Sequence, residues 1–167
     1  MRTKRETVLV NETKYTILRS YGHRKDGYLY LVTTGEEMYM MKEYDQNCLL
    51  KVLENYHILK NLGIRMPKYI EADLEKGILI KECIDGKSAY VLLQNGELED
   101  TFLDQLRYMA ERVEKENLCL DYFPTQFVCE GKDLYYIHYG CDEKNEKNCF
   151  SSCVKRFWIE RNGLCES

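Results

Sequence analysis

The stretch LCLDYFPTQFVCEGKDLYYIHYG, residues 118–140, decides the fold of this chain. It contains two short apolar runs on either side of a tight turn at 130–132, which predicts an antiparallel hairpin. A hairpin brings the residues just outside its two ends close together. We therefore expect Asp121 and Gln126, which precede the first strand or stand at its start, to converge with His138 at the end of the second strand. These three side chains form the candidate site.

Length and composition set the class of protein. A chain of 167 residues is long enough to bury the core of one compact domain, with room for a small appendage. Its 24 basic and 28 acidic side chains give a slightly acidic balance, which argues against nucleic acid as a partner. The apolar runs are far shorter than a membrane span, and the first ten residues lack the apolar core of a signal peptide. We expect a cytoplasmic protein that does not contact membranes.

The eight cysteines have two interpretations. Those in the first 130 residues are scattered singly, which is typical of reduced, buried thiols in a cytoplasmic protein. The C-terminal part instead gathers residues of soft-metal ligand type: His138, Cys141, Cys149, Cys153 and Cys165. The paired CxxC spacing of zinc sites is missing, so only the residue types, and not their spacing, favour a zinc site. A zinc-binding α+β domain therefore stays open as an alternative.

The N-terminal half reads as a sheet with one helix. Runs rich in Tyr, Val, Thr and Leu predict five antiparallel strands, at residues 15–19, 28–34, 37–44, 68–73 and 77–82. Residues 20–27 are expected to be the loop between the first two strands. Apolar residues at helical spacing predict a helix over 48–62, with Gly63 and Pro67 as its stop.

The composition changes at Asp85 and Gly86, which predicts a boundary between a sheet-and-helix part, 1–84, and a second part, 85–167. In the second part, a short helix is expected from Ala89 and a long amphipathic helix over 98–117, before the hairpin. The segment that starts at Cys149 is amphipathic, and four of its apolar residues are expected to dock onto the domain: Phe150, Val154, Phe157 and Trp158.

Lys42 interrupts an apolar strand. The alternation of YMMKEYD puts Met38, Met40 and Lys42 on one face of the third strand. A lysine on a methionine-lined face either has an ionic partner or belongs to an edge strand and extends to water. The sequence leaves both interpretations open.

The order of these elements, together with Lys42 and the 118–140 stretch, resembles the protein-kinase-like superfamily. The resemblance runs from about Tyr15 to Gly140. It is strongest to the small bacterial branch of the aminoglycoside-phosphotransferase and lipopolysaccharide-kinase type. It implies an α+β fold with a five-stranded antiparallel N-lobe sheet, one helix and a hinge. The C-lobe would be much reduced, to one long helix and a catalytic-loop hairpin.

The resemblance also implies roles for individual residues. Lys42 matches the third-strand lysine that holds the phosphates of ATP, and Glu54 matches the helix glutamate that orients it. Asp121 matches the catalytic-loop aspartate, which handles the proton of the acceptor hydroxyl. The hinge, where backbone groups meet the adenine ring, matches Glu82, Cys83 and Ile84.

Two positions depart from the family pattern. Gln126 stands where the family has a magnesium-binding asparagine, and His138 of IHYG stands where it has the aspartate of the DFG motif. Magnesium prefers oxygen ligands and carboxylates, whereas a histidine nitrogen suits transition metals. In addition, Cys119 replaces the catalytic-loop histidine, and a glycine-rich loop is missing.

These departures lead to three hypotheses. The first is a degenerate, pseudokinase-like module that binds ATP or regulates a partner protein, with little or no magnesium-dependent phosphoryl transfer. The second is an active ATP-dependent phosphotransferase that uses Asp121 as its base and acts on a serine, threonine or small-molecule hydroxyl. The third is the zinc-binding α+β domain.

Overall fold

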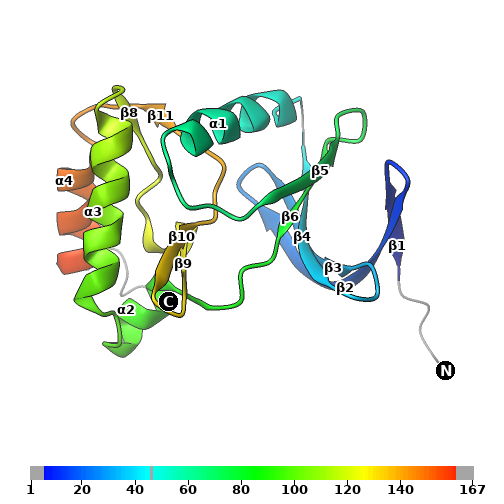
Figure 1. The fold of residues 1–167 in the computed structure, drawn as a ribbon, viewed down its shortest axis with the longest axis horizontal. Helices are drawn as coiled ribbons and strands as arrows, with labels where there is room; N and C mark the ends of the chain where they lie inside the picture. Colours follow the sequence, from blue (N-terminus) through cyan, green and yellow to red (C-terminus); the bar gives the residue numbers. More distant parts are fainter. Residues whose placement is uncertain (1–5, 46, 161–167) are drawn as a thin grey trace. The chain divides into compact units, whose positions relative to one another are not determined.

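The computed structural model describes residues 6–45 and 47–160, and the chain divides into two compact units. The first unit comprises residues 1–53 and 67–83. The second comprises residues 54–66 and 84–167. The division falls within helix α1 (Leu49–Asn61), the helix that the sequence predicts (Figure 1).

The first unit is an antiparallel sheet. Within its described residues the sheet has six strands in the order β1-β2-β3-β4-β6-β5. They are β1 (Thr7–Val10), β2 (Thr13–Arg24), β3 (Gly27–Thr33), β4 (Met38–Tyr44), β5 (Tyr69–Asp73) and β6 (Ile78–Glu82). All five expected strands are present, and β1 is an additional strand. A tight turn joins β1 to β2, and Asn11 enters the left-handed region there (φ 52°), a conformation that asparagine tolerates better than most residues.

The predicted loop at 20–27 is wrong, because most of these residues belong to strands. β2 continues to Arg24 and β3 begins at Gly27, so the connection is a tight turn. The register between the two strands shifts between Ser20 and His23, where Gly22 has a φ of 77°. A bulge at Gly22 therefore absorbs the irregular sequence without ending the strand.

The sheet curls until its two edge strands come together (Figure 1). Glu71 on β5 accepts hydrogen bonds from the Tyr15 hydroxyl (2.6 Å) and from Nδ2 of Asn11 (2.9 Å). Lys76 adds a hydrogen bond from its ammonium to the Leu9 carbonyl (2.7 Å). The curled sheet encloses an apolar core made of Val10, Tyr15, Val32, Met41, Ile78 and Ile80. Met41 lies in this core, so Lys42, the next residue on β4, projects from the other face.

The second unit combines helices with two small sheets. Its helices are α2 (Ala89–Asn95), α3 (Asp100–Glu114), the short 3-10 turn η1 (Pro124–Gln126) and α4 (Phe150–Cys153), which continues into the π-helical η2 (Val154–Ile159). The strands β10 (Asp133–Tyr136), β9 (Phe127–Glu130) and β7 (Lys87–Ser88) form one sheet in that order. The strands β8 (Leu118–Cys119) and β11 (Asp142–Glu143) form the other. In the part of the chain that is described, no helix has the length and apolar character needed to cross a membrane.

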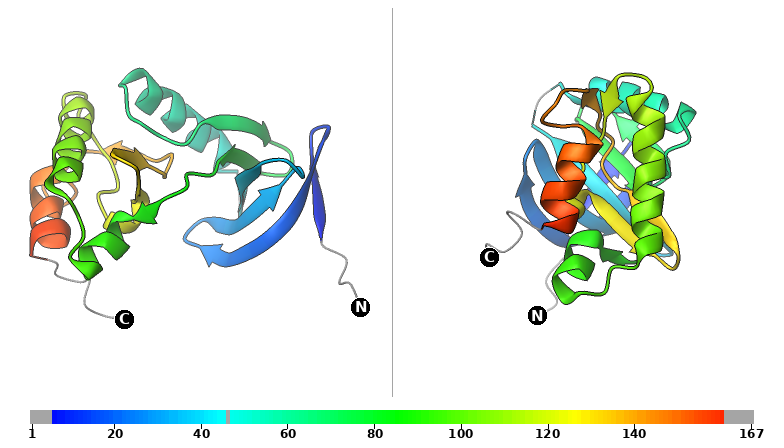
Figure 2. Two further views of the ribbon diagram at one scale, coloured as in Figure 1. Left: turned by 60° about the horizontal axis from the view of Figure 1, so that its bottom comes forward. Right: turned by 90° about the vertical axis from the view of Figure 1, so that its left-hand side faces the viewer.

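The C-terminal helical segment is part of the core of the second unit. Figure 2 shows α4 and η2 running beside α3. Trp158 is only 3% exposed, and its indole N–H donates to the Tyr122 carbonyl (2.7 Å). The expected docking is therefore confirmed: Trp158 is buried, and Phe150, Val154 and Phe157 pack against the same core.

Replacing Trp158 by alanine tests this docking. Trp158→Ala removes a buried aromatic ring and leaves the Tyr122 carbonyl without its donor, so we expect a loss of about 3 kcal/mol or more in the free energy of unfolding. Ile159 is the matched control, because its side chain is 64% exposed. Ile159→Ala should cost less than about 1 kcal/mol. Urea denaturation measures both, and equal losses would show that the segment does not stabilise the unit.

Candidate functional site

The β9–β10 hairpin assembles the predicted site. Its register pairs Phe127 with Tyr136, and the ladder extends one step further through a hydrogen bond from the Ile137 N–H to the Gln126 carbonyl (2.9 Å). Gln126 and His138 therefore lie at the same open end of the hairpin. The predicted turn at 130–132 is confirmed, with Gly131 in the left-handed region (φ 61°).

A buried tyrosine ties Asp121 to this end of the hairpin. The backbone N–H of Asp121 donates to the hydroxyl oxygen of Tyr136 (3.0 Å), and that hydroxyl donates to the Gly140 carbonyl (2.6 Å). Tyr136 is fully buried, and burial raises its pKa well above the ordinary value, so the hydroxyl keeps its proton. One side chain thus joins the loop before the hairpin to the segment after it.

Sequence reasoning missed Tyr136. The available signal was the alternation in DLYY, which places Leu134 and Tyr136 on one face of β10, and both are fully buried. A tyrosine on the buried face needs a partner for its hydroxyl. Its two partners, however, depend on how the flanking segments fold back, and the alternation does not give them.

The loop itself fixes the carboxylate of Asp121. Its Oδ1 accepts the N–H of Phe123 (3.1 Å), the arrangement of an Asx turn. Asp121 is half-buried, and η1 follows the turn directly. The carboxylate is therefore held in one orientation. The catalytic role that the resemblance gives Asp121 stays a prediction.

His138 folds back over the glycine that follows it. A Cβ atom at position 140 would lie 2.4 Å from Nε2 of His138, so the imidazole occupies the space that glycine leaves open. The ring also stands edge-on to Tyr136, with 6.0 Å between ring centroids. Tyr139, which lies between His138 and Gly140 in the sequence, is buried against the ring of Tyr56 on α1 (4.5 Å between centroids).

The residues at this site do not fit magnesium. The two residues that the resemblance assigns to the metal, Gln126 and His138, carry an amide and an imidazole, and the Asp121 carboxylate already accepts a backbone hydrogen bond. A hard cation of this kind is normally bound through one or two carboxylates. Among residues 6–45 and 47–160, no cluster of three or more histidine, cysteine or acidic side chains is placed to hold a metal ion.

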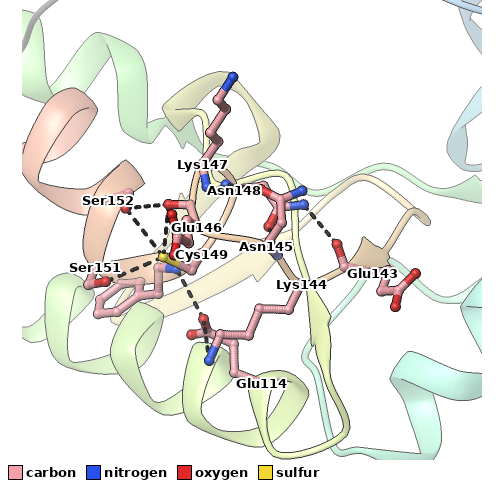
Figure 3. A network of polar contacts seen from close by, with 11 residues as sticks. Glu114, Glu143, Lys144, Asn145, Glu146, Lys147, Asn148, Cys149, Ser151 and Ser152 are labelled. Carbon is pink, nitrogen blue, oxygen red and sulfur yellow. Dashed lines mark hydrogen bonds and ion pairs between the residues drawn. The ribbon is translucent and has the colours of Figure 1, made fainter.

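Two of the C-terminal cysteines have hydrogen-bond partners near them in the chain, and Figure 3 shows those of Cys149. Sγ of Cys149 lies 3.4 Å from the Ser151 hydroxyl and 3.3 Å from the Ser152 hydroxyl, and these hydrogen bonds lower its pKa. Sγ of Cys153 donates to the Lys147 carbonyl (3.5 Å), and burial raises its pKa. The described part of the chain thus gives no support to the zinc site, and Cys165 lies outside it.

In the first unit, Lys42 forms an ion pair with Asp26, which lies in the turn between β2 and β3. Its side chain is only 13% exposed, and its ammonium lies 5.1 Å from the ring centroid of Tyr44. The strand β4 is flanked by β3 and β6, so the interpretation of Lys42 as an edge-strand lysine is wrong. The lysine has an ionic partner, as the alternative interpretation requires.

The other predicted nucleotide-binding residues lie on α1 and at the end of β6. Glu54 lies on the exposed side of α1, in the portion that belongs to the second unit, and its pairing with Lys42 stays a prediction. Glu82 ends β6, and its N–H donates to the Lys68 carbonyl (2.9 Å). Cys83 and Ile84 follow it and are half-buried. Their contact with an adenine ring also stays a prediction.

Lys81 is a further charged residue beside Lys42 that sequence reasoning missed. On β6 it lies opposite Met40 of β4, so it projects from the same face of the sheet as Lys42. Burial and, to a smaller extent, the positive charge of Lys42 lower the pKa of Lys81 to about 7, while the carboxylate of Asp26 opposes the shift. Lys42, Lys81 and Asp26 together are called the lysine cluster below.

Comparison with known proteins supports the fold. No protein-family model matches the chain, and no curated protein matches it. Among solved structures, the chain is similar to the autoinhibited serine kinase domain of the giant muscle protein titin, with a TM-score of 0.60 at 16% sequence identity. The match covers 78% of this chain and 46% of that structure, so this chain spans less than half of its length. The chain therefore has a protein-kinase-like fold, with a curled antiparallel sheet and helices.

The Tyr136 hydroxyl offers a test of how the site is held. Tyr136→Phe keeps the buried ring but leaves the Asp121 N–H and the Gly140 carbonyl without their partner, so we expect the free energy of unfolding to fall by about 2 kcal/mol. Tyr28→Phe is the control, because Tyr28 is 43% exposed, and it should change stability by less than about 0.5 kcal/mol. Chemical denaturation compares the two variants. Similar values would contradict the bridging role.

The lysine cluster predicts a pH dependence of stability. The lowered pKa of Lys81 means that between about pH 7 and 10.5 the unfolded chain binds more protons than the folded chain. Stability from this group therefore rises with pH across that window, by up to about 1 kcal/mol per pH unit. Lys81→Met should remove this rise. The free energy of unfolding of the variant should therefore exceed that of the wild type by the largest amount at pH 7 and below.

The measurement is the free energy of unfolding at pH 6, 7, 8 and 9 for the wild type and Lys81→Met. Lys14→Met serves as the control, because Lys14 is exposed on β2 in the same unit. Parallel curves for the wild type and Lys81→Met would show that Lys81 does not titrate in this range.

Proposed function

We propose that this chain is a degenerate kinase-like protein, a pseudokinase-like module that binds ATP or regulates a partner protein, with weak or no magnesium-dependent phosphoryl transfer. One observation carries the proposal. Gln126 and His138, the two residues that the resemblance assigns to the metal-binding positions, lie at the open end of the hairpin and carry an amide and an imidazole. The positions matching the phosphate-binding lysine and the proton-handling aspartate, Lys42 and Asp121, keep their family residues.

Loss of the metal affects catalysis more than nucleotide binding. Phosphoryl transfer depends on neutralising the charge that develops on the transferred group, and the metal supplies much of that neutralisation. Losing the metal anchor costs several kcal/mol of transition-state stabilisation, or roughly a thousandfold or more in rate. The ground-state affinity for a nucleotide depends less on these two residues, because the lysine and the hinge backbone contribute separately.

The observed ion pair bears on how a nucleotide binds. The Lys42 side chain is largely buried with Asp26 as its partner, so its charge is compensated before any phosphate arrives. A bound phosphate has to share the ammonium with Asp26 or replace it. Binding through Lys42 therefore carries an electrostatic cost that depends on Asp26.

The finer assignments belong to the same proposal. The sheet and helix of residues 1–84 act as the N-lobe, and residues 85–167 act as a reduced C-lobe built on α3 and the hairpin. Glu82, Cys83 and Ile84 act as the hinge for the adenine, and Glu54 orients Lys42. The chain belongs with the small bacterial kinase-like proteins and works in the cytoplasm.

An active ATP-dependent phosphotransferase is the second candidate. The observation that favours it is the Asp121 carboxylate, which the Phe123 N–H holds in a defined orientation at the start of the loop. A fixed carboxylate is what a general base for a hydroxyl acceptor requires. In this candidate the metal is held by groups other than His138.

Nucleotide titration tests the proposal. We expect ATP to raise the melting temperature of the wild type by a similar amount with and without magnesium, because His138 does not anchor the metal. Lys42→Met should abolish most of this shift. Absence of stabilisation under both conditions would overturn nucleotide binding, and a shift that requires magnesium would favour the active phosphotransferase.

Restoring the family carboxylate sharpens the same experiment. His138→Asp should make the ATP-induced shift larger in magnesium than in EDTA, because it returns an oxygen ligand to the metal position. His57→Asp is the matched control, since His57 is exposed on α1, and its shift should be unaffected by magnesium. If His138→Asp behaves like this control, the assignment of His138 to the metal position is wrong.

A further inference from the structure

Two cysteines stand one helical turn apart at the start of the C-terminal helical segment of the second unit. We propose that Cys149 and Cys153 form a site of reversible oxidation by hydroperoxides, in which Cys149 reacts with the peroxide and Cys153 then closes a disulfide with it. This modification site goes beyond the proposed function and does not depend on nucleotide binding.

The backbone places the two cysteines within reach of a disulfide. Cys149 is the N-cap of α4, and the N–H of Cys153 donates to the Cys149 carbonyl (3.1 Å). Residues four apart in a helix have Cβ atoms roughly 5–6 Å apart, and a disulfide requires roughly 3.5–4.5 Å. Cys149 is able to close this gap, because its backbone is extended (φ −68°, ψ 158°) and it is not held inside the helix.

Both sulfur atoms face the turn that precedes the helix. Sγ of Cys149 donates to the Glu146 carbonyl (3.5 Å), and Sγ of Cys153 donates to the Lys147 carbonyl (3.5 Å). Glu146 and Lys147 are consecutive, so the two thiols contact the same short stretch of backbone. The side chains of the two cysteines therefore converge at one end of the helix.

Cys149 has the properties of the attacking thiol. It is half-buried, so a small peroxide reaches it. Its sulfur lies 3.4 Å from the Ser151 hydroxyl and 3.3 Å from the Ser152 hydroxyl (Figure 3). These hydrogen bonds stabilise the thiolate and lower the pKa of Cys149, against the smaller opposing effects of burial and of the Glu114 carboxylate. The thiolate is the form of cysteine that attacks a peroxide.

Cys153 has the properties of the resolving thiol, the one that attacks the oxidised partner. It is only 9% exposed, and burial raises its pKa, so it keeps its proton and is shielded from the peroxide. A negative charge on Cys149 raises the pKa of Cys153 further, as expected for two neighbouring sulfur atoms. The order of events follows from these environments: Cys149 is oxidised first and Cys153 second.

The oxidant is a hydroperoxide, and the reaction balances in two steps. The Cys149 thiolate attacks one peroxide oxygen, the O–O bond breaks, and the leaving oxygen takes up a proton, which gives a sulfenic acid. The Cys153 sulfur then attacks the sulfur of the sulfenic acid, the S–O bond breaks, and the departing oxygen leaves as water with the Cys153 proton. One peroxide thus takes two electrons from two thiols. A thiol reductant reverses the modification by exchange.

Peptide mapping after brief oxidation tests the proposal. The reduced full chain is treated with a small excess of hydrogen peroxide, and the remaining thiols are alkylated with iodoacetamide under denaturing conditions. Trypsin cleaves after Lys147 and Lys155, so both cysteines fall in the peptide of residues 148–155. We expect this peptide to escape alkylation, to weigh less than its reduced form by two hydrogen atoms, and to regain its thiols in dithiothreitol.

The buried Cys129 gives the internal reference for the rate. It is 7% exposed, and burial raises its pKa to about 11, so it should react slowly. The peptide of residues 148–155 should lose its thiols at least about fivefold faster than Cys129 does. This comparison uses the wild-type protein and requires no variant to fold.

Variants separate the two roles. Cys153→Ser should leave a sulfenic acid on Cys149, which dimedone captures, and Cys149→Ser should leave Cys153 reduced. Ser151→Ala should slow disulfide formation about threefold, because one hydroxyl that stabilises the thiolate is lost. Cys48→Ser, in the first unit, is the matched control and should change nothing. Circular dichroism checks that each variant is folded.

Three results would refute the site. One is a rate for the 148–155 peptide no higher than that of Cys129, and another is undiminished oxidation of Cys153 in Cys149→Ser. The third is a disulfide that joins Cys153 to a different cysteine, such as the buried Cys119, in place of Cys149. A fast internal disulfide that requires both thiols supports the site.

Discussion

The candidate site depends on one buried hydroxyl. Tyr136 accepts the N–H of Asp121 and donates to the carbonyl of Gly140, so a single group satisfies the backbone at both ends of the β9–β10 hairpin. Buried backbone groups without partners are costly, and here both segments depend on the same side chain. The positions of Asp121 and His138 relative to each other follow from this bridge.

Backbone contacts fix the geometry of the hairpin end, and its side chains are an amide and an imidazole. Gln126 is still joined to Ile137 through the backbone, and the His138 ring fits over Gly140 because that residue has no side chain. Both features are compatible with a kinase-like fold. A nitrogen ligand and a neutral amide nevertheless provide little of the negative charge that a hard cation requires. Fold and metal chemistry are therefore separable in this chain, since backbone hydrogen bonds maintain the first and side-chain charge supplies the second.

In the first unit, the sheet face opposite the apolar core carries a group of charged side chains. Lys42, to which the resemblance gives the phosphates of ATP, has Asp26 as its observed partner, and a second lysine lies on the same face. Two lysines with one carboxylate cannot all be charged without a cost, and desolvation together with the charge of Lys42 lowers the pKa of Lys81.

The sequence by itself determined the local features. Period-2 and helical patterns gave the five expected strands, α1 and α3, because each depends on neighbours close in the chain. The amphipathic pattern of the C-terminal segment also indicated that it docks, but not its partner Tyr122, which is distant in the chain. The convergence of Gln126 and His138 was predictable for the same reason, since a tight turn fixes the register of its own hairpin.

The tertiary structure alone decided the contacts between distant segments. Strand β1 was missed because it depends on Asn11 adopting a left-handed turn, and the length of β2 because a bulge at Gly22 carries it through an irregular stretch. The bridge of Tyr136 and the lysine cluster depend on which strands pair and in which register. A shift of one residue would turn Lys81 to the opposite face of the sheet, and no local pattern specifies that register.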